Sequence, residues 1–213
     1  SVPLVTRVRN ATGSSFEPKV DRADDVVGAV PGIDVHYVVV EEGLYTAAED
    51  GIDLEAVRVL STVTARRGSW VAQSLSLAGS FGSPVVLGQV MTHNDARFST
   101  FWCHGSTIRS APTASSLSVG KQVAEDPDTS RANETLGVIV IESGTGTVGD
   151  YAFEAALGGD TIRGIDNGTY TYTLGGGVVG DSVVASQAAM DGGNGGWAAL
   201  DAINALSARP VSY

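Results

Sequence analysis

Four aromatic side chains are the residues of this chain best suited to bind a sugar. They are Trp70, Trp102, Trp197 and Tyr170. Indole and phenol rings present a flat apolar face with one polar group, and the C–H face of a sugar ring packs well on such a surface. We therefore take these four as candidate ligand-binding residues. Tryptophan also fills the cores of β-sandwiches, so burial is the alternative.

An acidic segment with Asp21, Asp24 and Asp25 is a candidate metal site. Carboxylate oxygens are the ligands that a hard cation such as calcium prefers. The Gly-rich segment Asp191–Gly196 offers fewer of them. The first segment is thus the better calcium candidate of the two, and a solvated acidic loop is the alternative. No other cofactor is expected.

Two pairs of glutamates suggest the paired carboxylates of a glycoside hydrolase. Such enzymes need two carboxyl groups at a set separation in one cleft. Glu41 and Glu142, however, hold equivalent places in two similar stretches of sequence, and so do Glu55 and Glu154. A carboxylate that recurs once per stretch favours a structural role, such as accepting hydrogen bonds from a turn.

Two further catalytic patterns lack the context that they need. Gly144–Gly149 matches a dinucleotide-binding fingerprint, but no alternation of strands and helices surrounds it. Cys103 and His104 are neighbours in a predicted strand, so their side chains point to opposite faces. We therefore predict a protein without enzymatic activity, and a buried cysteine.

One stretch of sequence occurs twice. Val35–Thr46 recurs about 100 residues later as Leu136–Thr147. Ser83–Met91 recurs at nearly the same offset as Asp181–Ala189. Two offsets that agree this closely indicate an internal duplication.

Short strand-like segments between Gly-rich turns predict an all-β fold of two similar antiparallel β-sandwich modules. Residues 3–10 and 16–20 alternate in polarity and predict a hairpin. The β-branched run Val35–Val40 predicts a strand that is buried on both faces. Val183–Ala189 predicts a further strand, and we expect at most short helical turns.

The order of the segments predicts one complete module and one divided module. Residues 66–165 form the complete one, whereas 1–65 and 166–213 supply the two parts of the other. A partial module exposes unpaired strand edges, which proteins normally avoid. The two parts therefore close on each other within one chain, or they exchange strands between chains and form a homo-oligomer or filament.

The charge balance excludes some partners. The chain has 13 Lys and Arg against 24 Asp and Glu, a formal net charge of −11. Nucleic acids and anionic membrane surfaces require clustered cations, so neither is an expected partner. No apolar run is long enough to span a bilayer, so we expect no membrane insertion. A strongly acidic surface keeps a protein soluble by self-repulsion and suits a saline habitat.

Three asparagines stand in the Asn-x-Thr pattern of N-glycosylation acceptors. The segments are Asn10–Thr12, Asn133–Thr135 and Asn167–Thr169. In a bacterial protein they are turn asparagines instead.

Several segments are similar to H-type lectin domains and to repeats of large secreted bacterial proteins. Arg7–Phe16 resembles the arginine-containing strand and Asn-x-Thr turn of these domains, and Phe81–Val86 resembles their central strand. Glu134–Gly144 resembles the end of the bacterial repeats. The resemblance implies a small antiparallel sandwich that often binds galactose-type sugars and often oligomerises. It also implies an extracellular or cell-surface location.

These observations lead to an extracellular structural or adhesive β-sandwich subunit that associates through strand edges and could form a filament. A carbohydrate-binding, lectin-like module is the alternative, with glycans as partners. A hydrolase with a carboxylate pair is the third hypothesis, and it requires two carboxyl groups that converge in a cleft.

Overall fold

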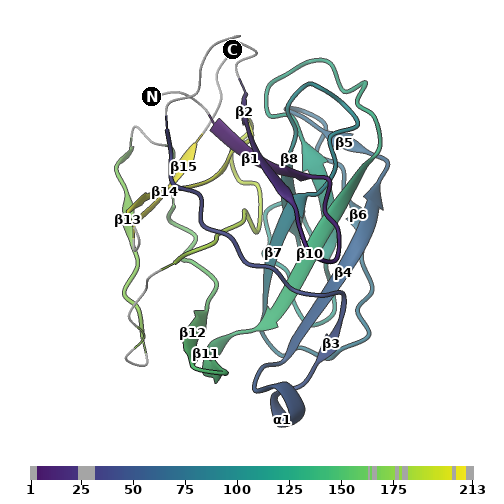
Figure 1. Ribbon diagram of the computed structural model, residues 1–213. Coiled ribbons are helices and arrows are strands. Elements are labelled where there is room, and N and C mark those ends of the chain that lie inside the picture. The colour runs from purple at the N-terminus through teal and green to yellow at the C-terminus, as the bar shows by residue number, and fades with distance from the viewer. Residues whose placement is uncertain are drawn as a thin grey trace.

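The structure is a computed structural model that describes residues 4–23, 32–162, 164, 167–175, 178, 182–202 and 205–209. It is all-β, as predicted, with one four-residue α-helix in the described part (Figure 1). The elements are β1 (Leu4–Arg9), β2 (Glu17–Arg22), β3 (Gly43–Tyr45), α1 (Ala47–Asp50), β4 (Leu54–Ser61), β5 (Thr64–Ala65), β6 (Gln73–Ser74), β7 (Pro84–Val90), β8 (Thr100–His104), β9 (Ser118–Gln122), β10 (Glu134–Glu142), β11 (Gly144–Val148), β12 (Tyr151–Ala155), β13 (Tyr170–Thr171), β14 (Trp197–Ala202) and β15 (Ala205–Arg209).

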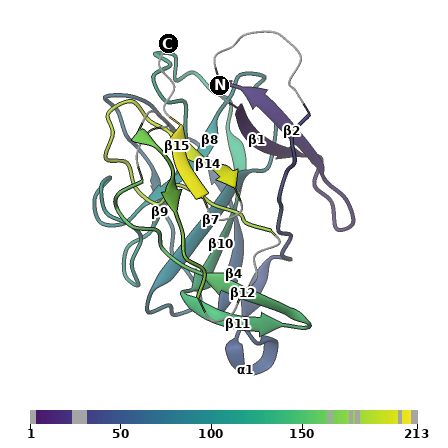
Figure 2. The same cartoon turned by 90° about the vertical axis from the view of Figure 1, so that its left-hand side faces the viewer.

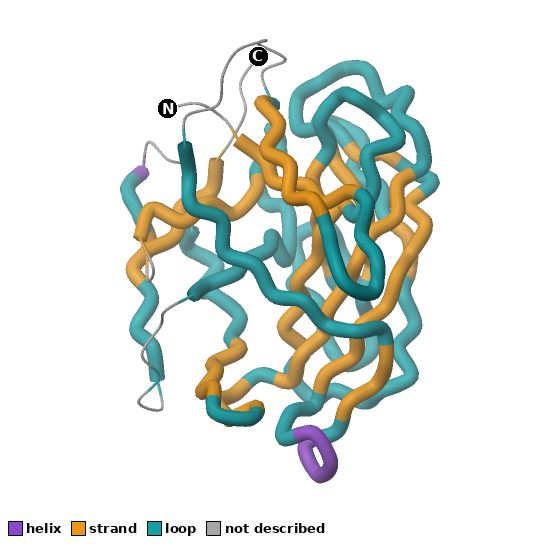
Figure 3. Tube along the Cα trace, viewed as in Figure 1, coloured by secondary structure: helices purple, strands orange, loops and turns teal. Residues whose placement is uncertain are grey.

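Two facing sheets form the sandwich on the right of Figure 1. One sheet has the order β3-β4-β10-β7 and is antiparallel throughout. In the other sheet, β9 pairs with β5, β6 and β8. Figure 3 shows the long loops that join the two sheets at their ends.

The core of the sandwich lies between these two sheets. β10 has a paired strand on each side. Alternate side chains of a strand point to the same face of its sheet, and those of Leu136, Val138 and Val140 point inward and are buried. They pack against Phe101 and Val119 of the opposite sheet, together with other residues of the same cluster. Burial of each such side chain contributes about 1.5–3 kcal/mol, so this cluster is the main source of stability.

Three smaller units surround the sandwich (Figure 2). β1 and β2 form the predicted N-terminal hairpin. β11 and β12 form a second hairpin directly after β10. β13, β15 and β14 form a small sheet. The N-terminal hairpin and the small sheet meet at Trp197, whose indole Nε1 donates a hydrogen bond of 2.8 Å to the carbonyl oxygen of Leu4.

The two similar stretches of sequence fold partly alike. In β3–β4, Gly43 faces Ala56 and Leu44 faces Glu55. In β11–β12, Gly144 faces Ala155 and Thr145 faces Glu154. Equivalent residues thus pair in the same register in both hairpins. The segments that precede the two hairpins differ.

The prediction for Val35–Val40 is wrong. This run is not a buried strand: residues 32–40 form no strand, and Tyr37 and Val39 are 65% and 68% exposed. A β-branched run is stable as a strand only when neighbouring strands flank it, and this run lacks a strand on either side. In Figure 1 it is the dark blue segment that crosses in front of the molecule towards β3.

The predicted strand Val183–Ala189 is also wrong, because these residues form no strand. β4 lies in the sheet of β10 and β7, so the sandwich takes strands from before residue 66, where the predicted complete module begins. β4 provides the hydrogen-bond partners for the backbone groups of β10 on that side.

Candidate functional site

Two of the four aromatic candidates are core residues. Trp102 is 0% exposed and lies with Ala65 and Met190 in a buried cluster. Trp197 is also buried and packs on Val5 and Phe98. Neither indole offers a face to a sugar, so the expected stacking role is corrected to a packing role, which is the alternative that the sequence left open.

Trp70 lines a shallow hollow on the surface. Its ring stands edge-on to Trp102, with 5.7 Å between the ring centroids. The hollow is also lined by Arg67, Gly68, Ile108, Arg109, Met190, Asp191, Gly192 and Gly193. Arg109 Nε lies 3.9 Å from the Asp191 carboxylate at its exposed rim. A half-buried indole beside an arginine and a carboxylate is an arrangement that suits a neutral polyol ligand.

The Gly-rich segment that was a weak calcium candidate forms one wall of this hollow. Gly195 has a φ of 79°, and a Cβ there would lie 2.7 Å from the Ala124 Cα and 3.0 Å from the Trp70 ring. Only glycine allows this approach. The segment therefore serves to close the chain over Trp70.

Tyr170 lies in β13, far along the sequence from Trp70, and is half-buried. Its ring centroid is 6.3 Å from that of Tyr172. The hollow beside Trp70 is not lined by Tyr170. The structure therefore does not bring the four aromatic candidates together in one site.

Asp21 is held by cationic side chains of the protein itself. Its carboxylate accepts a contact of 2.7 Å from Lys19 Nζ and lies 3.7 Å from Arg7 Nη1. Asp24 and Asp25 lie outside the described residues. Over the described part of the chain, no group of three His, Cys, Asp or Glu side chains is placed to hold a metal ion.

A buried ionic network joins the N-terminal hairpin to the sandwich, and sequence reasoning missed it. Arg7 is 1% exposed, and its Nη2 donates 2.8 Å to Glu134 Oε1 and 2.9 Å to the carbonyl oxygen of Thr92. Glu134 is 0% exposed and also accepts from the backbone N–H groups of Asn94 and Asp95. The only sequence signal was that Arg7 lies on the same face of its strand as Val5. An arginine is expected to be exposed unless a buried partner for its charge is known.

The network lowers the pKa of Glu134 and of Asp95. Burial alone would raise the pKa of Glu134, but hydrogen bonds from Thr92, Asn94 and Asp95 and the charge of Arg7 outweigh it and lower the pKa. For Asp95, burial is likewise outweighed, chiefly by hydrogen bonds from Arg97, and the pKa falls to about 2. Burial, Lys19 and Arg7 lower the pKa of the neighbouring His93.

Glutamates at strand ends hold loops in place. Glu55 accepts from the backbone N–H groups of Ala78 (3.0 Å) and Gly79 (2.7 Å). Glu142 does the same for Gly82 (2.6 Å) and Ser83 (2.8 Å). These contacts match the structural role that the sequence favoured for recurring glutamates.

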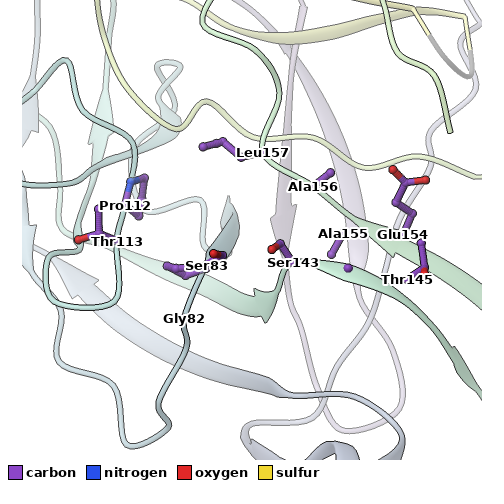
Figure 4. A pocket seen from close by; sticks show the side chains of 12 residues that line it. Gly82, Ser83, Pro112, Thr113, Ser143, Thr145, Glu154, Ala155, Ala156 and Leu157 are labelled. Carbon is purple, nitrogen blue, oxygen red and sulfur yellow. The ribbon is translucent and has the colours of Figure 1, made fainter. Parts of the chain in front are cut away.

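The larger surface hollow contains one charged side chain. It lies between the start of β7, the β10–β11 junction and the end of β12, and Figure 4 shows Ser83, Ser143, Pro112 and Leu157 around it. Glu154 is at its margin, and its carboxylate accepts 2.6 Å from the backbone N–H of Gly175. With a single carboxylate that is already bonded, this hollow lacks the pair that glycoside hydrolysis requires.

Cys103 is buried in the main core, as expected. Burial raises the pKa of its thiol, so the thiolate that a nucleophile needs is disfavoured.

Residues 186–190 connect the edges of the two sheets. Ser186 Oγ accepts 2.9 Å from the backbone N–H of Gly88 in β7, and the Gln187 carbonyl accepts 3.3 Å from the N–H of Cys103 in β8. A Cβ at Gly88 would lie 2.3 Å from the Phe101 ring, so glycine is required there. This segment closes the open side of the sandwich.

Comparison with known proteins adds one similarity. The chain is 29% identical over 169 residues to Halomucin of Haloquadratum walsbyi. The match covers 76% of this chain but only 2% of Halomucin. No family model and no solved structure matches the chain. Within the described residues, helices of the length and apolarity needed to cross a membrane are absent. The chain is thus an all-β protein that is similar in sequence to a small part of Halomucin.

Proposed function

We propose that this chain is a non-enzymatic, extracellular structural β-sandwich subunit that associates with other copies of itself through strand edges. The observation that carries the proposal is the contrast between two similar segments. Leu136–Glu142 makes up most of β10 and has strands on both sides, whereas Val35–Glu41 has the same pattern and no strand beside it.

The exposed segment Val35–Glu41 has the β-branched composition of a strand that pairs with neighbouring strands. Val35, Val38 and Val39 are 37%, 50% and 68% exposed. Monomeric proteins rarely leave a contiguous apolar run of this kind uncovered. An unpaired, β-prone segment adds readily to the edge of a sheet in another molecule.

The neighbours of β10 indicate which edge fits. β10 pairs with β7, and the sequence counterpart of β7 is the segment 182–189. His36 Nδ1 already lies 3.0 Å from Ser182 Oγ within one chain. By analogy with β10 and β7, the proposed partner of Val35–Glu41 is the segment 182–189 of a second copy. The competing arrangement is closure inside one chain, which the His36–Ser182 contact favours.

The extracellular location is supported by the similarity to Halomucin and by the charge. A net charge of −11 with two lysines keeps a surface strongly anionic. Self-repulsion of this size favours solubility, and it becomes weaker as the salt concentration rises.

Solution mass tests the association. We expect analytical ultracentrifugation of the wild-type chain to show oligomers that grow with protein concentration. A double variant Val38→Asp, Val39→Asp should remain monomeric, because two carboxylates cannot enter an apolar sheet. Its thermal unfolding should be unchanged, since both residues are exposed in the single chain.

Leu60→Asp is the matched control, because Leu60 is 55% exposed but lies in β4, away from the segment. This variant should assemble like the wild type. A wild-type chain that is monomeric at every concentration contradicts the proposal and favours closure within one chain.

Carbohydrate binding at the Trp70 hollow is the second candidate. The half-buried indole with Arg67, Arg109 and Asp191 at the rim favours it. Titration with galactose-type sugars should change the tryptophan fluorescence, and Trp70→Ala should abolish the change. Arg58→Ala, which alters an exposed residue outside the hollow, serves as the control. A glycan screen without any bound sugar removes this candidate.

A further inference from the structure

The three Asn-x-Thr segments lie at the surface of the folded chain. Asn10, Asn133 and Asn167 are all exposed. Each follows or precedes a strand or lies in a turn, where a bulky group meets no packed neighbour. We propose that these three asparagines are attachment sites for N-linked glycans. The proposal does not depend on the association through strand edges.

Asn10 lies in the loop between β1 and β2. It has a φ of 52°, and its side-chain Nδ2 donates 3.0 Å to Glu17 Oε1. An amide nitrogen carries two hydrogens, and glycosylation replaces one of them. The bond to Glu17 can therefore persist beside a glycan.

The third residue of this segment is also accessible. Thr12 is exposed, and its Oγ1 accepts from the backbone N–H groups of Ser14 (3.3 Å) and Ser15 (3.1 Å). Thr12 thus holds the tip of the loop independently of Asn10. Modification of Asn10 leaves those contacts intact.

Asn167 lies in an exposed turn before β13. Its backbone N–H donates 2.8 Å to the Gly164 carbonyl, and its Nδ2 lies 3.4 Å from the same oxygen. Gly168 follows with a φ of 81°, and Thr169 is exposed. A glycan on Nδ2 needs only to displace one long hydrogen bond.

Asn133 differs because it is attached to the core. The next residue, Glu134, is 0% exposed, and Thr135 pairs with Leu60 inside the sheet. A glycosyltransferase must bind the whole Asn-x-Thr segment, so it cannot bind Asn133–Thr135 once β10 has formed. Asn133 is therefore modified before folding, whereas Asn10 and Asn167 stay accessible afterwards.

The reaction requires a lipid-linked oligosaccharide as the donor. The bond between the anomeric carbon and the lipid phosphate oxygen breaks, and a bond between that carbon and Asn Nδ2 forms. The amide loses one proton to the released lipid phosphate. No electron transfer occurs, and no residue of this chain acts as a catalyst.

Glycopeptide mapping of the protein recovered from its own producing cells tests the proposal. We expect hexose-containing mass additions on the peptides of Asn10, Asn133 and Asn167. Asn94 and Asn194 are exposed but are not followed by Ser or Thr at the second position, so they are internal controls and should be unmodified. Unmodified peptides at all three sites overturn the proposal.

Variants secreted from a glycosylating host test the pattern itself. Thr12→Ala should abolish modification of Asn10, whereas Thr12→Ser should retain it. Incubation of the folded, unmodified chain with transferase and donor should modify Asn10 and Asn167 but not Asn133. Equal modification of Asn133 in the folded chain contradicts the assigned order.

Discussion

Leu136–Glu142 and Val35–Glu41 have similar sequences and opposite fates. The first is the centre of a four-stranded sheet, and its inward side chains are buried. The second lies on the surface without a strand on either side. The hairpins that follow them pair in the same register. The contrast teaches that the hairpin is specified locally, whereas the preceding strand requires neighbours from elsewhere in the chain.

The largest difference should appear two residues before the two segments begin. Glu134 is buried against Arg7, and its counterpart Ile33 is 43% exposed. Glu134→Ala should lower the free energy of unfolding by about 3–5 kcal/mol, because it leaves Arg7 buried without its partner. Ile33→Ala should change it little. Urea denaturation followed by circular dichroism measures both, and equal effects contradict the contrast.

Valine truncation sharpens the comparison within the segments. Val140 is 0% exposed, whereas its counterpart Val39 is 68% exposed. Val140→Ala should cost about 2 kcal/mol through lost burial and a small cavity. Val39→Ala should cost nothing measurable in the monomer. A destabilised Val39→Ala monomer would mean that the segment is buried in solution.

The loop-holding glutamates allow a comparison of the two hairpins. Glu55 is buried with two backbone N–H partners, and Glu154 is half-buried with one. Glu55→Ala should cost about 1–3 kcal/mol, since it removes the acceptor of two part-buried backbone N–H groups. Glu154→Ala should cost less. Thermal unfolding of both variants measures the two costs, and a larger cost for Glu154→Ala would contradict this ranking.

Acidification should reveal the network that only one segment possesses. The pKa of Asp95 is lowered from 3.8 to about 2 in the folded chain. As pH falls, the unfolded chain therefore takes up the proton first, so the contribution of Asp95 is present above about pH 4 and is lost towards pH 2. Asp95→Asn should flatten the pH dependence of the unfolding free energy in this range. An unchanged slope contradicts the assignment.

Local patterns predicted the all-β fold, the N-terminal hairpin and the buried Cys103. They did not predict the state of Val35–Val40, because a β-branched run looks the same whether or not partner strands are available. Trp102 and Trp197 could not be told from surface aromatics, since burial depends on contacts between distant segments. The Arg7–Glu134 pair joins residues 127 apart in sequence, so no local pattern indicates it.

The segment with Ser186 and Gln187 affects how another chain could pair with this sandwich. It occupies the outer rims of β7 and β8, which would otherwise offer free backbone groups to any passing chain. The finished sandwich is therefore capped along its flank. A second chain that paired with the segment 182–189 would first have to displace these contacts with β7 and β8.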